Sequence, residues 1–378
     1  MKVLVVSHPC ATAANQALFA EIRRVTGWDL RLVVPAGWRD EFGNALDQPD
    51  WPGMEGLVKK VPVVFNGRII PHAHRLNWRG FLHKGNFDAI YMHHEPYGVA
   101  TGQVCLANAM SGRPAAFGFY SAQNLMKRYP PPFSWIEHLV HRSSSFAFPV
   151  SNSVAEILRL KKTRAALTVC PLPFDPALYF PREGSPALGR DGGPVIGYVG
   201  RLVEPKGLRT LATALGELRE LPWTFHAIGT GDFQGAFESL LAAQGLSGRA
   251  TFHGYVPHHE TPEFLSAFDL LVVPSETQPG WKEQFGRVII EALACGTAVV
   301  GSDSGEIPVL IRSSGGGLVF PEKNSRALAD SIRKLLLDPV LRGGMAESGR
   351  LWAEQNVSME IVARRMATAI AGAKEGRP

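Results

Sequence analysis

The chain has 378 residues, of which 45% are hydrophobic and 19% are charged, and its formal net charge is +5. This size and composition predict a globular protein of two domains. The four cysteines form no C-x-x-C pair, so neither a disulfide framework nor a structural zinc site is indicated. No apolar run reaches the roughly 18 residues of a membrane span, and the first residues predict a strand rather than a secretory signal. We therefore expect a cytoplasmic protein.

The charge is divided unevenly along the chain. Residues 1–178 contain 19 Lys and Arg against 12 Asp and Glu, a net charge of +7, whereas residues 179–378 contain 20 against 22, a net charge of −2. This asymmetry indicates that the first half faces an anionic partner or surface. The alternative is that the basic side chains form the solvated face of the domain.

Strand and helix patterns alternate through the first half. Residues 2–6 predict a buried strand, residues 13–25 a helix and residues 30–35 a second strand. Further strands are expected at 59–65, 87–92, 115–119, 146–150 and 166–173. This order is typical of a Rossmann-like domain.

Residues 71–84 mix hydrophobic side chains with Arg75, Arg79, Lys84 and three histidines, which predicts a basic amphipathic helix. Such a helix lies on an anionic membrane in some proteins. More often it packs its apolar side on its own domain, and Gly80 weakens the helix. Both interpretations stay open at this point.

Polar side chains follow three of the predicted strands where each strand ends. In an open α/β sheet the loops after the carboxyl ends of the strands form the ligand crevice. Ser153 with Glu156 also fits a capping box. Each cluster alone is as well explained by a cap or turn, but their shared position predicts an acceptor-side site formed by His93, Glu95, Gln123, Asn124 and Ser153.

Proline and glycine concentrate between the two halves, which predicts a linker at residues 176–194. The first domain would then cover residues 1–175 and the second residues 195–355. Residues 356–378 predict a final helix.

The second domain begins with a predicted strand at 195–199 and a loop bounded by Gly200 and Gly207. Arg201 and Lys206 lie on this loop, where two cations would neutralise the charge that develops on a departing diphosphate. The alternative is a pair of exposed loop charges. Residues 229–235 nearly match a dinucleotide fingerprint, but no acidic residue follows at the expected strand end, so a tight turn is favoured over an NAD site.

Residues 281–296, W-K-E-Q-F-G-R-V-I-I-E-A-L-A-C-G, carry the strongest pattern in the chain. A buried helix is expected to open at Gly286 and to end at Gly296. The N–H groups of Phe285, Gly286 and Arg287 would then face an anion such as a phosphate. This motif therefore predicts an anion site at a helix N-terminus.

Two glutamates, Glu283 and Glu291, lie eight residues apart in this motif. If all eight residues were helical, the separation would be roughly 12 Å, too far for the paired carboxylates of a glycosidase. It suits two carboxylates that bind hydroxyls at opposite ends of a nucleotide sugar. The alternative is a solvated loop residue and a helix-surface charge, but a carboxylate between Ile290 and Ala292 is costly without a partner.

At these residues the chain resembles the family 4 retaining glycosyltransferases, whose mark is Glu, seven residues and Glu, preceded by P-S and followed by A-x-x-x-G. The resemblance implies a GT-B fold, an α/β architecture of two Rossmann-like domains facing across a cleft. It implies that Glu283 contacts the donor sugar, that Glu291 contacts the ribose and that Arg201 and Lys206 contact the phosphates. The other donor-binding positions that it implies are Gly200, Gly254, Tyr255, Val256, Ser275, Gln284, Phe285, Gly286 and Arg287.

The first half departs from the family in two places. Gln123 or Asn124 stands where the family often has a histidine, and residues 8–14 replace a glycine-rich loop. In the family the final helix packs back on the first domain, which is an expectation for residues 356–378. The departures concern acceptor binding rather than the donor site.

The predicted function is transfer of a sugar from a UDP- or GDP-linked donor to an acceptor hydroxyl with retention, in glycan, glycolipid or cell-envelope synthesis. No Asp-x-Asp pair is present, so we expect no metal and no other cofactor. The expected partners are the donor and a glycan, a lipid-linked or a small-molecule acceptor, with peripheral membrane contact as a further option and no nucleic acid. A nucleotide-sugar epimerase and a non-catalytic sugar-nucleotide binding protein are the alternatives.

Overall fold

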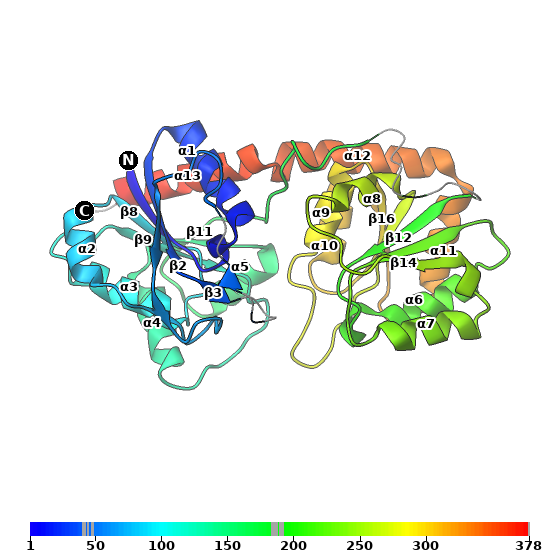
Figure 1. Ribbon diagram of the computed structural model, residues 1–378, viewed down its shortest axis with the longest axis horizontal. Coiled ribbons are helices and arrows are strands. Elements are labelled where there is room, and N and C mark those ends of the chain that lie inside the picture. The colour runs from blue at the N-terminus through cyan, green and yellow to red at the C-terminus, as the bar shows by residue number, and fades with distance from the viewer. Residues whose placement is uncertain (40–42, 44, 47–48, 183–187, 189–192, 377–378) are drawn as a thin grey trace. The chain divides into compact units, whose positions relative to one another are not determined.

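The computed structural model describes residues 1–39, 43, 45–46, 49–182, 188 and 193–376. The chain forms two compact units, an N-terminal unit of Met1–Pro171 with Met359–Pro378 and a C-terminal unit of Leu172–Ser358 (Figure 1). Within the linker predicted at 176–194, residues 183–187 and 189–192 lie outside the described residues.

A parallel seven-stranded sheet forms the centre of the N-terminal unit, in the order β11-β10-β9-β8-β1-β2-β5. Successive strands are added outward from β1, first on one side and then on the other, so the order reverses between β1 and β8. Two short antiparallel ribbons lie outside this sheet. The strands are β1 (Lys2–Val6), β2 (Asp29–Pro35), β3 (Trp38–Arg39), β4 (Ala45–Leu46), β5 (Val58–Val61), β6 (Val63–Val64), β7 (Ala73–His74), β8 (Ala89–Met92), β9 (Ala116–Ser121), β10 (Phe146–Pro149) and β11 (Ala166–Leu167).

Helices cover both faces of this sheet (Figure 1). One face packs on α1 (Ala17–Thr26) and α13 (Met359–Glu375), which contribute Phe19, Ile22, Val362 and Met366 to a core with β1 and β2. The other face packs on α2 (Trp78–Gly85), α3 (Val99–Ala109), α4 (Phe133–Ser143) and α5 (Asn152–Leu160). The short 3-10 helices η1 (Pro9–Ala11) and η2 (Ala13–Gln16) precede α1.

Several boundaries of this unit differ from the sequence-based expectations. The helix predicted at 71–84 is only α2, because β7 occupies Ala73–His74 and Asn77 caps the helix through its side chain. The strand predicted at 59–65 is split between β5 and β6, which belong to different sheets. The N-cap of α5 is Ser151 rather than Ser153, since the Ser151 side chain accepts from the Val154 N–H.

The C-terminal unit contains a parallel six-stranded sheet in the order β14-β13-β12-β15-β16-β17. The order again reverses once, between β12 and β15. The strands are β12 (Val195–Val199), β13 (Thr224–Ile228), β14 (Ala250–Phe252), β15 (Leu270–Val273), β16 (Ala298–Ser302) and β17 (Gly317–Phe320).

One face of this sheet packs on helices rich in leucine, which share a core with Ile196, Tyr198 and Phe225. These helices are α6 (Leu208–Gly216), α7 (Gln234–Ala243) and α11 (Ser325–Leu337). The other face is covered by α9 (Arg287–Ala294), α10 (Ile307–Ser314) and α12 (Pro339–Val357). The remaining elements are α8 (Thr261–Ala267), η3 (Glu204–Lys206) and η4 (Ser247–Arg249).

Helix α12 was not expected from the sequence, because Gly343, Gly344 and Gly349 weaken a helix pattern. The packing explains one of these glycines. A Cβ atom at Gly349 would lie 2.4 Å from Leu293 of α9 and 3.0 Å from the Cα of Gly316. Close packing against α9 therefore outweighs the low helix propensity at this position.

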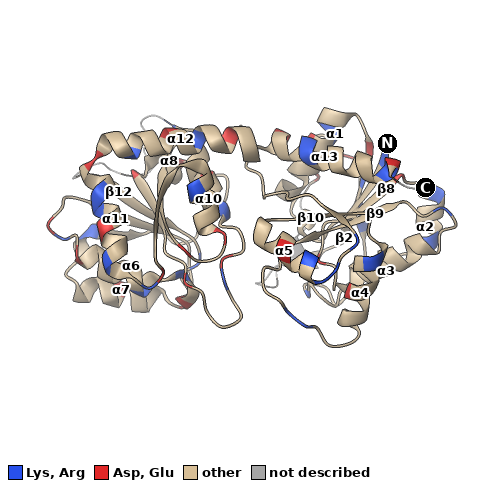
Figure 2. Cartoon of the chain, turned by 180° about the vertical axis from the view of Figure 1, so that it is seen from behind, with Lys and Arg blue, Asp and Glu red and all other residues tan. Residues whose placement is uncertain are grey.

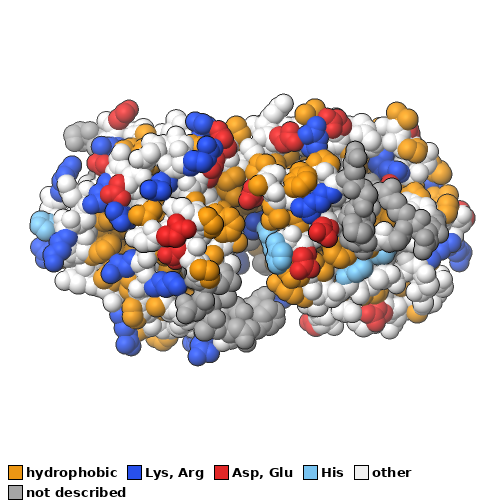
Figure 3. Space-filling view, turned by 45° about the horizontal axis from the view of Figure 1, so that its top comes forward, with side chains coloured by type: hydrophobic (Ala, Val, Ile, Leu, Met, Phe, Trp, Pro, Cys, Tyr) orange, Lys and Arg blue, Asp and Glu red, His pale blue; other side chains and the backbone are white. Residues whose placement is uncertain are grey.

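Basic residues are spread over the N-terminal unit. Figure 2 shows Lys and Arg on α2 and α13, among other elements of this unit. On the face seen in Figure 3 they are interspersed with hydrophobic and acidic side chains rather than gathered in one patch. Among the described helices, none is long and apolar enough to cross a membrane.

Candidate functional site

The loops after β12 and β15 meet where the strand order of the C-terminal unit reverses. In doubly wound sheets, ligands bind at the carboxyl ends of the strands at such a point. Gly200, Arg201 and Lys206 follow β12, whereas Ser275 and Glu283 follow β15. The topology therefore places the predicted phosphate-binding cations beside the first glutamate of the motif.

Glu283 is the centre of a compact polar group. The Lys206 ammonium lies 2.6 Å from its carboxylate, and the Ser275 hydroxyl donates to the same oxygen at 2.9 Å. The Lys206 ammonium also lies 5.3 Å from the centre of the Trp281 ring. The two charged side chains are 23% and 13% exposed, so the pair is only partly screened by water.

Two glycines allow the backbone segments around this group to approach closely. Gly207 has φ +68°, and a Cβ there would lie 1.9 Å from the Pro274 carbonyl oxygen. A Cβ at Gly305 would lie 2.0 Å from the Glu283 carbonyl oxygen. Any larger residue would push the Lys206 loop away from Ser275, or the 305 turn away from Glu283.

The predicted helix after Glu283 is α9, and Gly286 is its N-cap with φ +78°. No side chain caps this end, and within the described residues the N–H groups of Gly286, Arg287 and Val288 donate no hydrogen bond to the protein. Three non-helical residues separate Glu283 from Arg287, the first residue of α9, so the all-helical spacing of the two glutamates does not apply. The start of α9 thus combines free amides with the positive end of the helix dipole, which are the features that favour an anion.

Glu291 lies within α9 and is 6% exposed. Its carboxylate contacts the Arg287 guanidinium at 3.0 Å and the His258 Nε2 at 3.1 Å. The Tyr179 hydroxyl lies 2.9 Å from the same His258 nitrogen. The contacts with Arg287 and His258 reduce the free-energy cost of burying this carboxylate.

Sequence reasoning missed His258 and Tyr179. Tyr179 belongs to the segment expected to be a linker, yet it is 2% exposed and packs against His258. Neither residue stands in a pattern, because they lie 79 positions apart and meet only through the fold. The contacts of His258 with Glu291 and with Tyr179 therefore could not be read from spacing.

The remaining donor-side residues differ in exposure. Gly254 has φ +67° and its carbonyl accepts from the Gly229 N–H, while Tyr255 is 77% exposed and Val256 is partly buried. Phe285 is buried under the α9 start and Gln284 is exposed beside it.

In the N-terminal unit, Glu95 follows β8 and connects this loop to the loop after β9. Its carboxylate accepts from the Ala122 N–H at 2.7 Å and from the Ser121 hydroxyl at 2.8 Å. Burial raises the pKa of Glu95 to about 7. Glu95 is thus placed at the strand reversal of this unit with a proton that exchanges near neutral pH.

The other acceptor-side candidates differ in environment. His93 packs against Phe19 and Tyr120, and burial lowers its pKa to about 4. The Gln123 side chain accepts from the Leu125 N–H, and both Gln123 and Asn124 are buried. Ser153 contacts the Ser151 hydroxyl at 2.9 Å.

A buried histidine cluster beside this edge was not anticipated. The rings of His8, His72 and His94 lie 4.8 to 5.6 Å apart, and His74 lies 5.6 Å from His72. Burial lowers the pKa of His74 to about 3 and that of His94 to about 4. Over the part of the chain that the structure describes, no group of three or more His, Cys, Asp or Glu residues is placed to hold a metal ion.

The sequence of the chain is similar to those of known proteins. Residues 183–352 match the family model described as Glycosyl transferases group 1. An alpha-D-kanosaminyltransferase from Streptomyces kanamyceticus is 27% identical over 68% of this chain and 70% of its own length. A GDP-mannose-dependent alpha-(1-6)-phosphatidylinositol monomannoside mannosyltransferase from Mycolicibacterium smegmatis is 31% identical over 49% of each chain. A 2-deoxystreptamine glucosyltransferase from Streptomyces kanamyceticus is 31% identical over 44% of this chain and 42% of its own.

Solved structures agree on the fold. A sucrose-phosphate synthase from Thermosynechococcus elongatus has a TM-score of 0.75 and 19% identity, with 98% of both chains covered. Anabaena Alr3699/HepE in complex with UDP has a TM-score of 0.75 and 20% identity, with 98% and 100% covered. The chain thus has the GT-B fold, and its residues 183–352 are similar to the glycosyl transferases group 1 family.

Proposed function

We propose that the protein transfers a sugar from a nucleotide diphosphate sugar to an acceptor hydroxyl with retention of anomeric configuration. The observation that carries this proposal is the group of Lys206, Glu283 and Ser275 at the strand reversal, next to the open N-terminus of α9. The cation and the free amides match the diphosphate of such a donor, and the carboxylate matches the hydroxyls of its sugar.

The main catalytic task is to stabilise the departing diphosphate. The amides of α9 supply fixed dipoles, and Lys206 with Arg201 supplies positive charge. Arg201 is exposed, and no described carboxylate lies within ion-pair distance of its guanidinium. The Lys206 ammonium lies 2.6 Å from Glu283, so diphosphate binding requires the ammonium to move from this carboxylate or to be shared with it.

Glu283 would then accept hydrogen bonds from the hydroxyls of the donor sugar. The Ser275 hydroxyl orients the Glu283 carboxylate through a hydrogen bond, and the close approach of Gly305 fixes the Glu283 backbone. Because these contacts form at the reacting sugar, Glu283 is expected to act mainly on turnover.

Glu291 would bind the ribose hydroxyls through Oε2, because Arg287 and His258 both contact Oε1. The two partners fix the orientation of the carboxylate before the nucleotide arrives. Loss of Glu291 should therefore weaken nucleotide binding more than it slows turnover. The exposed loop of Gly254, Tyr255 and Val256 is proposed to meet the nucleobase.

Metal independence is part of the proposal. It rests on Lys206, Arg201 and the α9 amides, which together could neutralise the diphosphate without a divalent ion. The test is to treat the protein with EDTA and then to add magnesium or manganese. Activity that disappears with EDTA and returns with metal would contradict this part.

The acceptor is assigned to the N-terminal unit, with Glu95, His93, Gln123, Asn124 and Ser153 as candidates. Relatives with printed activities use a GDP-linked mannose or act on 2-deoxystreptamine, so UDP and GDP donors and both lipid-linked and small acceptors are to be tested. A cytoplasmic location with peripheral membrane contact is proposed from the net charge of +7 that residues 1–178 carry.

The deciding experiment has two stages. Thermal-shift measurements with a panel of UDP and GDP sugars identify the donor, because a ligand that binds the folded state raises its melting temperature. The donor is then incubated with and without candidate acceptors. Product only with acceptor supports the transferase, whereas an epimer formed from donor alone would contradict it.

A further inference from the structure

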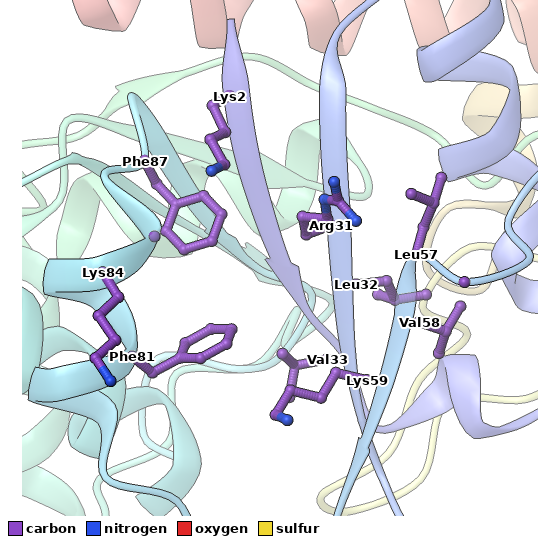
Figure 4. A pocket seen from close by; sticks show the side chains of 12 residues that line it. Lys2, Arg31, Leu32, Val33, Leu57, Val58, Lys59, Phe81, Lys84 and Phe87 are labelled. Carbon is purple, nitrogen blue, oxygen red and sulfur yellow. The ribbon is translucent and has the colours of Figure 1, made fainter.

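A cavity in the N-terminal unit lies between α2 and the strands at one edge of the sheet. Its volume is about 350 Å³, within the range of small-molecule sites. In Figure 4, Phe81 and Lys84 extend from α2 on one side, and Arg31, Val33 and Lys59 extend from β2 and β5 on the other. None of these residues belongs to the proposed donor or acceptor sites.

The strand pattern explains why charge gathers on this face. Val33 and Val61 point toward α2 and are part of the core beneath it. Arg31 and Lys59 precede them by two positions and therefore point to the same face. Toward the amino ends of β2 and β5 the apolar core thus gives way to cationic side chains.

Positive charge exceeds negative charge around the cavity. Lys2, Arg31, Lys59 and Lys84 all line it, and Asp29 contacts two of them, Arg31 at 2.8 Å and Lys2 at 3.9 Å. Of the carboxylates that the structure describes, none lies within ion-pair distance of Lys59 or Lys84. Two lysine ammonium groups are therefore available to an anion.

The cavity also has an apolar wall. The rings of Phe81 and Phe87 lie 6.0 Å apart with an interplanar angle of 38°, and both line the cavity. The Lys2 ammonium lies 5.5 Å from the centre of the Phe87 ring. Cationic and apolar groups thus line one cavity, which suits a ligand with an anionic head and an apolar body.

We propose that this cavity binds a soluble phosphate monoester of a small apolar alcohol. A phosphate monoester carries a charge of roughly −1.5 to −2 at neutral pH, so as a ligand it balances the charge of two lysines better than a singly charged carboxylate does. The phosphate binds Lys59 and Lys84, and the apolar part packs on Phe81 and Phe87. The site is independent of the proposed transferase reaction.

The test is calorimetric titration of the full chain with phenyl phosphate, phenol and inorganic phosphate. Phenyl phosphate should bind at least about tenfold more tightly than either fragment, since it alone reaches both the lysines and the rings. The variant Lys59→Glu/Lys84→Glu should lose this binding. Equal affinity for phenyl phosphate and inorganic phosphate would overturn the proposal.

The matched control is Lys60→Glu/Arg79→Glu, which makes the same change of charge on the same strand and helix. Neither residue lines the cavity, so phenyl phosphate binding should persist, and melting curves should show all variants folded. Equal loss in both variants would show general electrostatic attraction and overturn the site. Binding only to phosphatidate vesicles, lost in Lys59→Glu/Lys84→Glu, would overturn the soluble ligand in favour of a lipid.

Discussion

Replacing Lys206 by methionine tests the phosphate role in depth. The substitution keeps most of the apolar body of the side chain and removes the charge that lies 2.6 Å from Glu283. If this ammonium stabilises the departing diphosphate, kcat should fall by about 100- to 1000-fold, or about 3 to 4 kcal/mol, as when one oxyanion donor is lost. The assay is steady-state transfer at saturating donor, with nucleotide release as the readout.

The same variant also changes stability, and the two effects can be separated. Lys206 and Glu283 are 23% and 13% exposed, so loss of this charged hydrogen bond should lower the free energy of unfolding by about 1.5 to 3 kcal/mol. The double variant Lys206→Met/Glu283→Gln removes the uncompensated carboxylate, so it should recover stability without recovering kcat.

Arg209→Met is the control, because Arg209 forms an exposed ion pair with Glu204 on the adjoining helix and should leave turnover unchanged. A Lys206→Met enzyme with unchanged kcat and a normal nucleotide affinity would refute the phosphate role.

Three further predictions follow from other parts of the structure. Glu291→Gln should weaken nucleotide binding by on the order of tenfold, measured by calorimetry, with a smaller effect on kcat; equal affinity would contradict the ribose role. Gly207→Ala should destabilise the C-terminal unit by more than about 1 kcal/mol in denaturant melts, since its φ is +68° and Pro274 blocks a Cβ; an unchanged midpoint would contradict the close approach. Because the folded-state pKa of Glu95 is raised to about 7, the folded state binds its proton more tightly and stability falls as pH rises from about 4.5 to 7. Glu95→Gln should remove up to about 3 kcal/mol of that fall, measured as unfolding free energies at pH 5 and pH 8; identical pH dependence in both proteins would show an unperturbed carboxyl.

Where local sequence pattern and tertiary packing agree, the fold could be predicted. β1 and β12 lie where their apolar patterns place them, at Lys2–Val6 and Val195–Val199. The opening of α9 at Gly286 was also predictable, because a positive φ at a helix start requires a residue without a Cβ. Two Rossmann-like units followed from the alternation of strand and helix.

The rest depended on contacts between distant residues. The helix expected at 71–84 is shortened because β7 pairs with β6, a partner that the amphipathic pattern does not reveal. Ser151 rather than Ser153 caps α5. Both are suitable N-cap residues, and the sequence does not reveal that Ser151 has the extended backbone of the cap position. The histidine cluster draws on residues 8, 72, 74 and 94, which no local window contains.

The partners of Glu291 show the same limit for the site. The sequence indicates that a carboxylate in an apolar helix needs a partner, and Arg287 at the i−4 position is one that spacing can supply. His258, which contacts this carboxylate, comes from the segment before α8. Tyr179, which contacts His258, comes from the start of the C-terminal unit. Both contacts could be identified only in the folded chain.

The most direct measurement is a crystal structure of the protein with the nucleoside diphosphate that gives the largest thermal shift. The proposed donor site requires phosphate oxygens at the N–H groups of Gly286, Arg287 and Val288 and beside Lys206, with the ribose at Glu291. A diphosphate bound away from the start of α9, with the Lys206–Glu283 pair unchanged, would contradict it.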